Sequence, residues 1–399
     1  MHRDIRRALT AALLILSAGV GYAQERPSEF ANYVIPGWSF TPGISLSGMW
    51  DSNVSLSAPE AELGRTLGDN LFVIVPSAQV SLLSARTTFD AGYRGYLRRY
   101  QDVGHLNGFD QRAYAGFKHA LTPRLNLSIA DEFSRLPTTD LLWVYGVPFR
   151  RLGAKTNQFA TELDARLTKY VDFGIRYENT WAAFDRVDEF INGGTIHGFS
   201  ANVKRRLSER ATVGVEGRIR RSDVTRIVPR IAWFRDAGAT FAYRLTEFLT
   251  LNLAGGFSYV REDFGNTTRT SPYYRIGLQH GMERVTMGVT LEQSYTPTFS
   301  LGGSNNNREL RGFVNMPFGR NRFYVQADAS WRRWDRTSVT DVQFDTVITQ
   351  AVVGYSALRW LRMEAYHAYS RQDSIIPGAP IQRHRIGTQV VVSQPMRIR

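Results

Sequence analysis

Hydrophobic and polar residues alternate with a period of two along most of the chain. From Val171 to Tyr177 every odd position is apolar or aromatic, while Asp172, Arg176 and Glu178 place charges at even positions. Successive side chains of a β-strand point to opposite faces, so this pattern predicts a ribbon with one apolar face and one ionic face. Similar ribbons recur from about residue 70 to the C-terminus.

Short turns and longer polar loops alternate between these ribbons. Leu167–Val171 and Leu207–Ala211 are two of the short turns and share a similar local sequence. Longer loops are expected near residues 51–69, 99–111, 135–155, 183–195, 221–229, 261–271, 295–309, 333–342 and 371–382. Outer-membrane barrels have this asymmetry, with short turns at the periplasmic end and long loops outside the cell.

The predicted fold class is all-β: a single transmembrane, antiparallel, up-and-down β-barrel of about 18 strands. The first strand is expected near Gly43–Trp50 and the last near His384–Val392. The number becomes 16 if the first hairpin lies outside the wall, and the alternation is poorest in Leu71–Leu83 and Phe344–Tyr355. A soluble β-sandwich is the alternative, because it also alternates, but it would bury its apolar faces between two sheets.

The alternation also assigns a face to each residue. Leu249, Leu251 and Leu253 are expected to face lipid, while Thr250 and Asn252 face the lumen. No water reaches the hydrocarbon core of a membrane, so every backbone amide there must be paired, and a closed sheet achieves this without a free edge.

The N-terminus resembles a secretory signal. A basic start is followed by the short apolar run Ala8–Val20 and by small residues that predict cleavage between Ala23 and Gln24. The run is too short to span a bilayer as a helix. The expected division is a signal peptide at 1–23, a periplasmic N-terminal segment at 24–40 and the barrel at 41–399.

Composition narrows the possible partners. The chain has 399 residues, no cysteine, 12% aromatic residues and a formal charge of +13. Export argues against nucleic acid as the partner of this basic chain and favours outer-membrane lipid, anionic lipopolysaccharide or anionic solutes. No cofactor motif is present, and the histidines of the mature chain are scattered over separate hairpins, so we expect no enzyme. A calcium site at Asp51 and Asn53, near Glu60 and Glu62, is a weak alternative to no metal.

Charged residues recur in the lumen-facing phase, and cations outnumber anions among them. The candidate pore-lining residues are Arg94, Arg98, Arg176, Lys204, Arg206, Arg218, Arg220, Arg244, Arg275 and Arg332. One interpretation is that cross-strand ion pairs stiffen a polar wall. The other is a basic pore that favours anions. The loop Arg135–Lys155 is unusually apolar, which predicts that it folds inward as a constriction or packs on the rim.

Two further features are resemblances. Ile386–Val392 is similar to the terminal-strand signal read by the barrel-assembly machinery, although the chain continues through Pro395 to Arg399. Trp50–Val54 follows an early strand and contains an Asp-x-Asn segment, and Tyr93-Arg94-Gly95-Tyr96 lies in a Tyr-rich third strand. These segments resemble the outer-membrane β-barrel porin family that is often linked to exopolysaccharide export. The resemblance implies a passive or export-associated channel for small solutes or polysaccharide. A structural, surface-binding barrel with a closed lumen is the alternative.

Overall fold

The computed structural model describes residues 36–57, 67–139, 146, 147, 149–185, 191–224, 230–263, 266–282, 284–299, 304–319, 322–335, 343–373 and 380–398. The predicted signal peptide and its cleavage site at Ala23 and Gln24 lie outside these residues and stay predictions. β1 begins at Gly37, inside the segment assigned to the periplasm. The proposed division of the chain into three parts likewise stays a prediction.

Long strands make up almost all of the described chain. The first nine are β1 (Gly37–Asp51), β2 (Asp69–Leu83), β3 (Thr87–Tyr100), β4 (Gly108–Thr122), β5 (Leu125–Leu136), β6 (Ala154–Arg166), β7 (Val171–Phe184), β8 (Gly194–Arg206) and β9 (Ala211–Val224). The others are β10 (Arg230–Arg244), β11 (Leu249–Glu262), β12 (Thr267–Gly281), β13 (Thr286–Pro297), β14 (Ser304–Phe318), β15 (Phe323–Asp335), β16 (Phe344–Leu358), β17 (Leu361–Gln372), β18 (Ile381–Ser393) and the two-residue β19 (Met396–Arg397). The 3₁₀ turn η1 (Gly104–Leu106) lies between β3 and β4.

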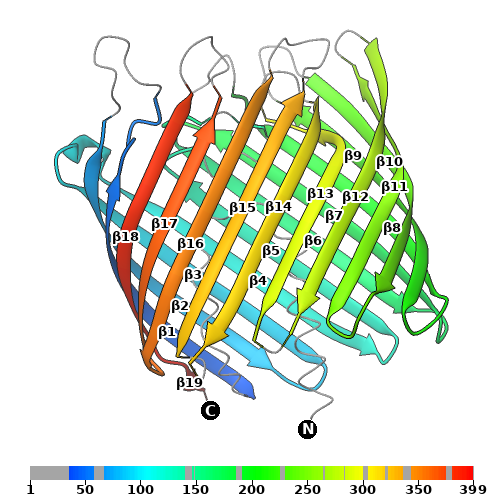
Figure 1. The fold of residues 1–399 in the computed structure, drawn as a ribbon, viewed down its shortest axis with the longest axis horizontal. Coiled ribbons are helices and arrows are strands. Elements are labelled where there is room, and N and C mark those ends of the chain that lie inside the picture. Colours follow the sequence, from blue (N-terminus) through cyan, green and yellow to red (C-terminus); the bar gives the residue numbers. More distant parts are fainter. Residues whose placement is uncertain are drawn as a thin grey trace.

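Each of the strands β1 to β18 pairs antiparallel with its neighbour in sequence, the short β19 pairs with β1, and the sheet closes on itself (Figure 1). Closure is made by β18 and β1, in a register that joins Gly43 to Ser393 and Asp51 to Arg385. The prediction of a closed all-β barrel of about 18 strands is therefore confirmed. The first hairpin is part of the wall, so the alternative of 16 strands is wrong. A single closed sheet also excludes the two-sheet sandwich.

The strands are long enough to cross a membrane at a tilt. A 14-residue strand extends roughly 46 Å at about 3.3 Å per residue. At a tilt of about 40° it would span roughly 35 Å, more than the apolar band of roughly 25 Å found in such barrels. The strands run obliquely in Figure 1. Their ends therefore extend into the polar interface on both sides.

The outer surface of the barrel is apolar. On β11 the side chain of Phe257 is 69% exposed, whereas the next residue, Ser258, is fully buried on the inner side. Phe72 and Val215 are exposed on the outside in the same way. Such a surface is stable only against hydrocarbon, and single-chain bacterial barrels of this kind span the outer membrane. The protein is an outer-membrane barrel. No helix in the described ranges is long and apolar enough to cross a membrane.

One strand leaves the wall before it ends. β13 pairs with β12 only from Gly281/Thr286 to Tyr274/Gln293, although it stays paired with β14 up to Pro297/Ser304. Beyond Gln293 it contacts β9, β10 and β11 instead. The loop expected at 295–309 is therefore shorter than predicted, because residues 295–297 belong to β13 and residues 304–309 belong to β14.

Candidate functional site

The candidate site is the inner surface of the barrel, where alternate residues of each strand meet. The structure places the predicted pore-lining residues on the following strands: Arg94 and Arg98 on β3, Arg176 on β7, Lys204 and Arg206 on β8, Arg218 and Arg220 on β9, Arg244 on β10, Arg275 on β12 and Arg332 on β15. The strand register then decides which carboxylates meet these cations.

Arg218 and Arg220 share one acidic partner on the neighbouring strand. The Asp236 carboxylate on β10 lies 3.3 Å from Nε of Arg218 and 2.9 Å from Nη2 of Arg220. The hydroxyl of Ser258 also donates to Asp236, at 2.5 Å. Arg220 and Asp236 are each 6% exposed, so this network lies inside the structure. Charged hydrogen bonds in such a place are stronger than in water, and each group depends on its partner.

Arg275 lies between two carboxylates on the same side of the barrel. Its guanidinium is 3.6 Å from Glu216 and 3.5 Å from Glu292. It also donates to the hydroxyl of Tyr273 at 2.6 Å, and Tyr273 donates in turn to Glu216. Arg176 likewise lies 3.5 Å from Glu162 and 3.6 Å from the carboxylate two residues along its own strand.

Other candidate cations are paired as well. Arg98 bonds to Asp110, and Arg332 bonds to Glu309. Six of the ten candidates thus meet carboxylates, which supports the interpretation that ion pairs stiffen a polar wall. The guanidinium of Arg94 lies 6.0 Å from the ring of Tyr114. Among the described residues no ion pair is found for the remaining candidates: Arg94, Lys204, Arg206 and Arg244.

The end of β13 from Ser294 onward, together with the residues that follow it to Phe299, leaves β12 and crosses into the interior near the extracellular end. Tyr295 packs against Phe234 and Val260 on β10 and β11. Its carbonyl accepts a bond from Arg220 at 2.7 Å, and its amide donates to Ser258 at 3.3 Å. Arg220 therefore ties this segment to the wall in addition to pairing with Asp236. Sequence reasoning did not find this role, because nothing in the local pattern shows that β13 leaves its neighbour.

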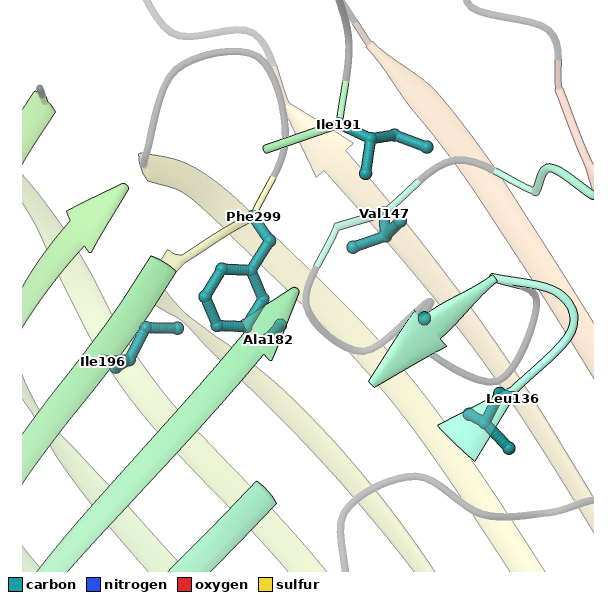
Figure 2. Close-up of a cluster of buried hydrophobic side chains, with 7 residues drawn as sticks. Leu136, Val147, Ala182, Ile191, Ile196 and Phe299 are labelled. Atoms are coloured by element: carbon teal, nitrogen blue, oxygen red, sulfur yellow. The ribbon is translucent and has the colours of Figure 1, made fainter. Parts of the chain in front are cut away.

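A hydrophobic cluster joins this segment to the opposite side (Figure 2). Phe299 is fully buried and clusters with Leu136 of β5 and Ala182 of β7. Ile191, which precedes β8, is also fully buried there, and the amide of Asn192 donates to the carbonyl of Phe299 at 2.8 Å. Strands β5 and β7 are far from β13 around the barrel, so Phe299 lies well inside the ring of strands.

The β5–β6 loop contributes to the same cluster. Val147 and Phe149 are fully buried, and the amide of Phe149 donates to Oε1 of Gln372 on β17 at 2.7 Å. Arg151 donates to the carbonyl of Val54 at 2.6 Å. The expectation of inward folding is thus confirmed for the described part of this loop. Its apolar residues at 141–145 and 148 lie outside the described residues. We call residues 137–139, 146, 147 and 149–153, together with 294–299, the inner cap.

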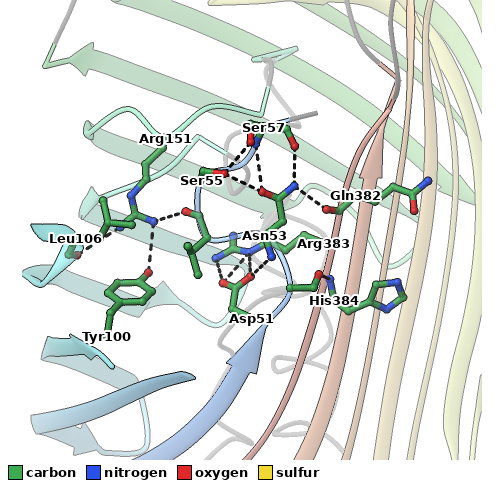
Figure 3. Close-up of polar contacts among 12 residues, drawn as sticks. Asp51, Asn53, Ser55, Ser57, Tyr100, Leu106, Arg151, Gln382, Arg383 and His384 are labelled. Carbon is green, nitrogen blue, oxygen red and sulfur yellow. Dashed lines mark hydrogen bonds and ion pairs between the residues drawn. The ribbon is translucent and has the colours of Figure 1, made fainter. Parts of the chain in front are cut away.

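The Asp-x-Asn segment lies at the seam where the barrel closes (Figure 3). Asp51 at the end of β1 is fully buried and accepts bonds from Arg383 of β18, with Nε at 3.0 Å and Nη2 at 2.5 Å. The side-chain amide of Asn53 donates to the carbonyls of Gln382 and Ser57, at 2.9 and 2.8 Å. The segment therefore locks the first strand to the last.

The weak calcium alternative finds no support at this seam. Arg383 occupies the carboxylate of Asp51, which a cation would need. The two glutamates that were expected to assist, Glu60 and Glu62, lie outside the described residues. Within the part of the chain that the structure describes, no group of three or more metal-ligating side chains is found.

Comparisons with known proteins find similar solved structures but no sequence family. No protein-family model matches the sequence, and no curated protein matches it significantly. OccAB4 of Acinetobacter baumannii is similar in structure with a TM-score of 0.46 and 10% identity, covering 90% of this chain and 98% of that one. OpdK of Pseudomonas aeruginosa, solved with vanillate, has a TM-score of 0.45 and 11% identity, covering 90% and 99%. The ferric citrate transporter FecA has a TM-score of 0.43 and 10% identity, covering 89% and 64%. The fold assignment rests on the strand pairing and not on these similarities.

Proposed function

We propose that the protein is a porin-like channel of the outer membrane for small polar solutes. The observation that carries the proposal is the partial exposure of ionic groups deep in the barrel. The side chains of Arg176, Arg218 and Arg275 are 26%, 27% and 38% exposed, although they point away from the lipid. A closed, dry core would bury such ion pairs completely, so water reaches the interior below the inner cap.

The inner cap sets the size of what passes. It narrows the extracellular part of the bore with fully buried side chains such as Val147 and Phe299. A narrowed bore of about 18 strands suits small solutes better than a polymer. Export of exopolysaccharide, which the sequence resemblance implied, stays a prediction. The same is true of polysaccharide and the barrel-assembly machinery as partners.

The charge preference of the channel is part of the proposal. Paired arginines are screened by their carboxylates, so their contribution to anion selection is reduced. Arg206 and Arg244, at the periplasmic ends of β8 and β10, are exposed and without an ion pair in the described chain. We infer a modest anion preference that arises chiefly at this mouth, because rings of cations favour anions.

Conductance across a planar lipid bilayer tests the channel. Purified folded protein should give discrete current steps, and reversal potentials in a salt gradient should show a modest anion preference. The double variant Arg206→Glu/Arg244→Glu should reverse that preference. Arg176→Glu/Arg218→Glu tests the deeper pair of candidates and should shift selectivity toward cations. The matched control is Arg205→Glu, which changes the outward residue next to Arg206 and should leave selectivity unchanged.

A structural or surface-binding barrel with a closed lumen is the second candidate. The buried contacts of the inner cap favour it, because they could seal the mouth completely. In that case the folded protein would carry no current at any voltage. The absence of current from a preparation that is shown to be folded would remove the channel and leave this alternative.

A further inference from the structure

Cationic side chains gather on the outer face of the strands near their extracellular ends. Those that the structure describes are Arg99, Arg135, Lys155, Arg221, Arg235, Arg261, Arg308, Arg333 and Arg371. Near the periplasmic ends the outward strand positions are mostly apolar, and Arg205 is an exception. A cation that faces lipid at mid-depth is costly, but near the interface the cost is small, and an anionic headgroup can pair with it there.

The most compact group lies on β9, β10 and β11. In the strand register Trp233 lies between Arg221 and Arg261, and Arg235 lies directly opposite Tyr259. Neighbouring strands are about 4.8 Å apart, so these three guanidinium groups share one small area of the outer face. We call Arg221, Arg235 and Arg261 the arginine patch.

Aromatic rings hold two of these arginines in place. Cζ of Arg221 lies 5.8 Å from the ring of Trp233, and Cζ of Arg235 lies 5.8 Å from the ring of Tyr259. A guanidinium stacked on an aromatic ring keeps its N–H donors free for an anion. The two rings therefore orient the patch without neutralising it.

Carboxylates balance the patch only in part. Asp223 lies 3.4 Å from Arg221. Among the described residues, Arg235 and Arg261 have no ion-pair partner. Like charges close together on a sheet destabilise it, so an external anion that lies between these arginines stabilises the folded barrel.

Large apolar side chains lie directly below the patch. Phe257 is 69% exposed on β11, Ile219 is 47% exposed on β9, and Phe199 is 50% exposed on the adjacent β8. Down the barrel wall, the surface thus changes from cationic to aromatic and aliphatic. A lipid changes in the same order, from its charged phosphate to its apolar acyl chains. A dissolved anion would gain nothing from contact with the apolar side chains.

We propose that the arginine patch binds the phosphate group of a phosphate-bearing lipid in the outer leaflet, with the acyl chains lying over Phe257 and Ile219. The proposal rests on the orientation of the barrel in the outer membrane, with its long loops outside. The proposal does not depend on whether the barrel conducts. A failure to bind lipid and a failure to conduct would therefore be distinguishable results.

Native mass spectrometry of the detergent-solubilised protein tests the proposal, with purified lipid A as the probe. The wild-type barrel should retain lipid A and should bind chemically dephosphorylated lipid A much more weakly. Arg235→Gln/Arg261→Gln should bind lipid A about thirtyfold more weakly, because each cation contributes about 1 kcal/mol to binding an anionic lipid and 1.4 kcal/mol corresponds to tenfold. The matched control Arg205→Gln should bind like the wild type.

Two results would overturn the proposal. One is equal binding of lipid A and its dephosphorylated form by the wild type, which needs no variant to fold. The other is unchanged lipid A binding by Arg235→Gln/Arg261→Gln. An equal loss in Arg205→Gln would also contradict it, because binding would then follow total charge and not the patch. A heat-modifiability gel on each variant confirms that the barrel compared is folded.

Discussion

Replacing Arg220 by alanine should open the mouth of the barrel. Arg220 donates a 2.7 Å bond from the wall to the carbonyl of Tyr295 near the end of β13, and it also bonds to Asp236 within the wall at 2.9 Å. Hydrogen bonds to charged groups contribute about 1.5–3 kcal/mol each. The bond to Tyr295 is the one of the two that reaches the inner cap. If it contributes about 2 kcal/mol, its loss favours an open arrangement of residues 294–299 about thirtyfold.

Single-channel recording is the assay for this change. Arg220→Ala should show a larger or more frequently open conductance than the wild type, while the wall itself stays folded because its backbone pairing is unaffected. Arg218→Ala is the matched control. It removes a 3.3 Å contact with the same Asp236 but no bond to Tyr295. Identical behaviour of Arg220→Ala and Arg218→Ala would refute the idea that Arg220 holds the inner cap.

Two further substitutions test the stability of the wall. Asp51→Ala removes the carboxylate that the buried Arg383 binds at the seam, so the barrel should lose about 3–5 kcal/mol and unfold at a lower urea concentration in lipid vesicles. Ser57→Ala, at an exposed position of the same loop, is the control. Gly354→Ala would place a Cβ 2.0 Å from the ring of Tyr324 and should cost about 1–3 kcal/mol. Gly281→Ala meets nothing within 4 Å and should be neutral, and equal effects of the two glycine substitutions would contradict the packing described.

The strands could be predicted from the sequence because one face of each strand contacts lipid and the other contacts the polar interior. Val171–Tyr177 lies in β7, as its alternation indicates. The pattern was weak in β2 for a reason that the structure explains. Leu71 and Val73 point inward, yet they are apolar, because they pack against Val54 from the loop between β1 and β2. Local alternation cannot show that a loop returns to cover the inner face.

The ion pairs could not be predicted from the sequence. Ionic residues could be assigned to the inner phase, but their partners depend on the register between strands, which local patterns leave open. Asp236 illustrates this, since it pairs with two arginines on β9 and thereby reduces the basic character expected of the bore. The role of Asp51 was missed for the same reason, because Arg383 is more than 300 residues away in sequence.

The departure of β13 from the wall was also missed. Gln293, Ser294 and Tyr295 are three consecutive buried residues, a pattern that fits neither a lipid-facing nor a lumen-facing strand. Gln293 is still bonded to β12, whereas Tyr295 is buried against β10 and β11 by tertiary packing. The bend could be predicted only if the residues on other strands that pack against this segment were known.

Cysteine labelling tests the central claim most directly, namely that side chains along each strand alternate between hydrocarbon and a wet interior. The chain contains no cysteine, so single-cysteine variants report on one position each. In intact outer membranes, a water-soluble thiol reagent small enough to enter the bore should label cysteine at positions Thr250 and Asn252 but not at Leu251 and Leu253. Labelling of all four positions alike, or of the leucine positions alone, would contradict the account.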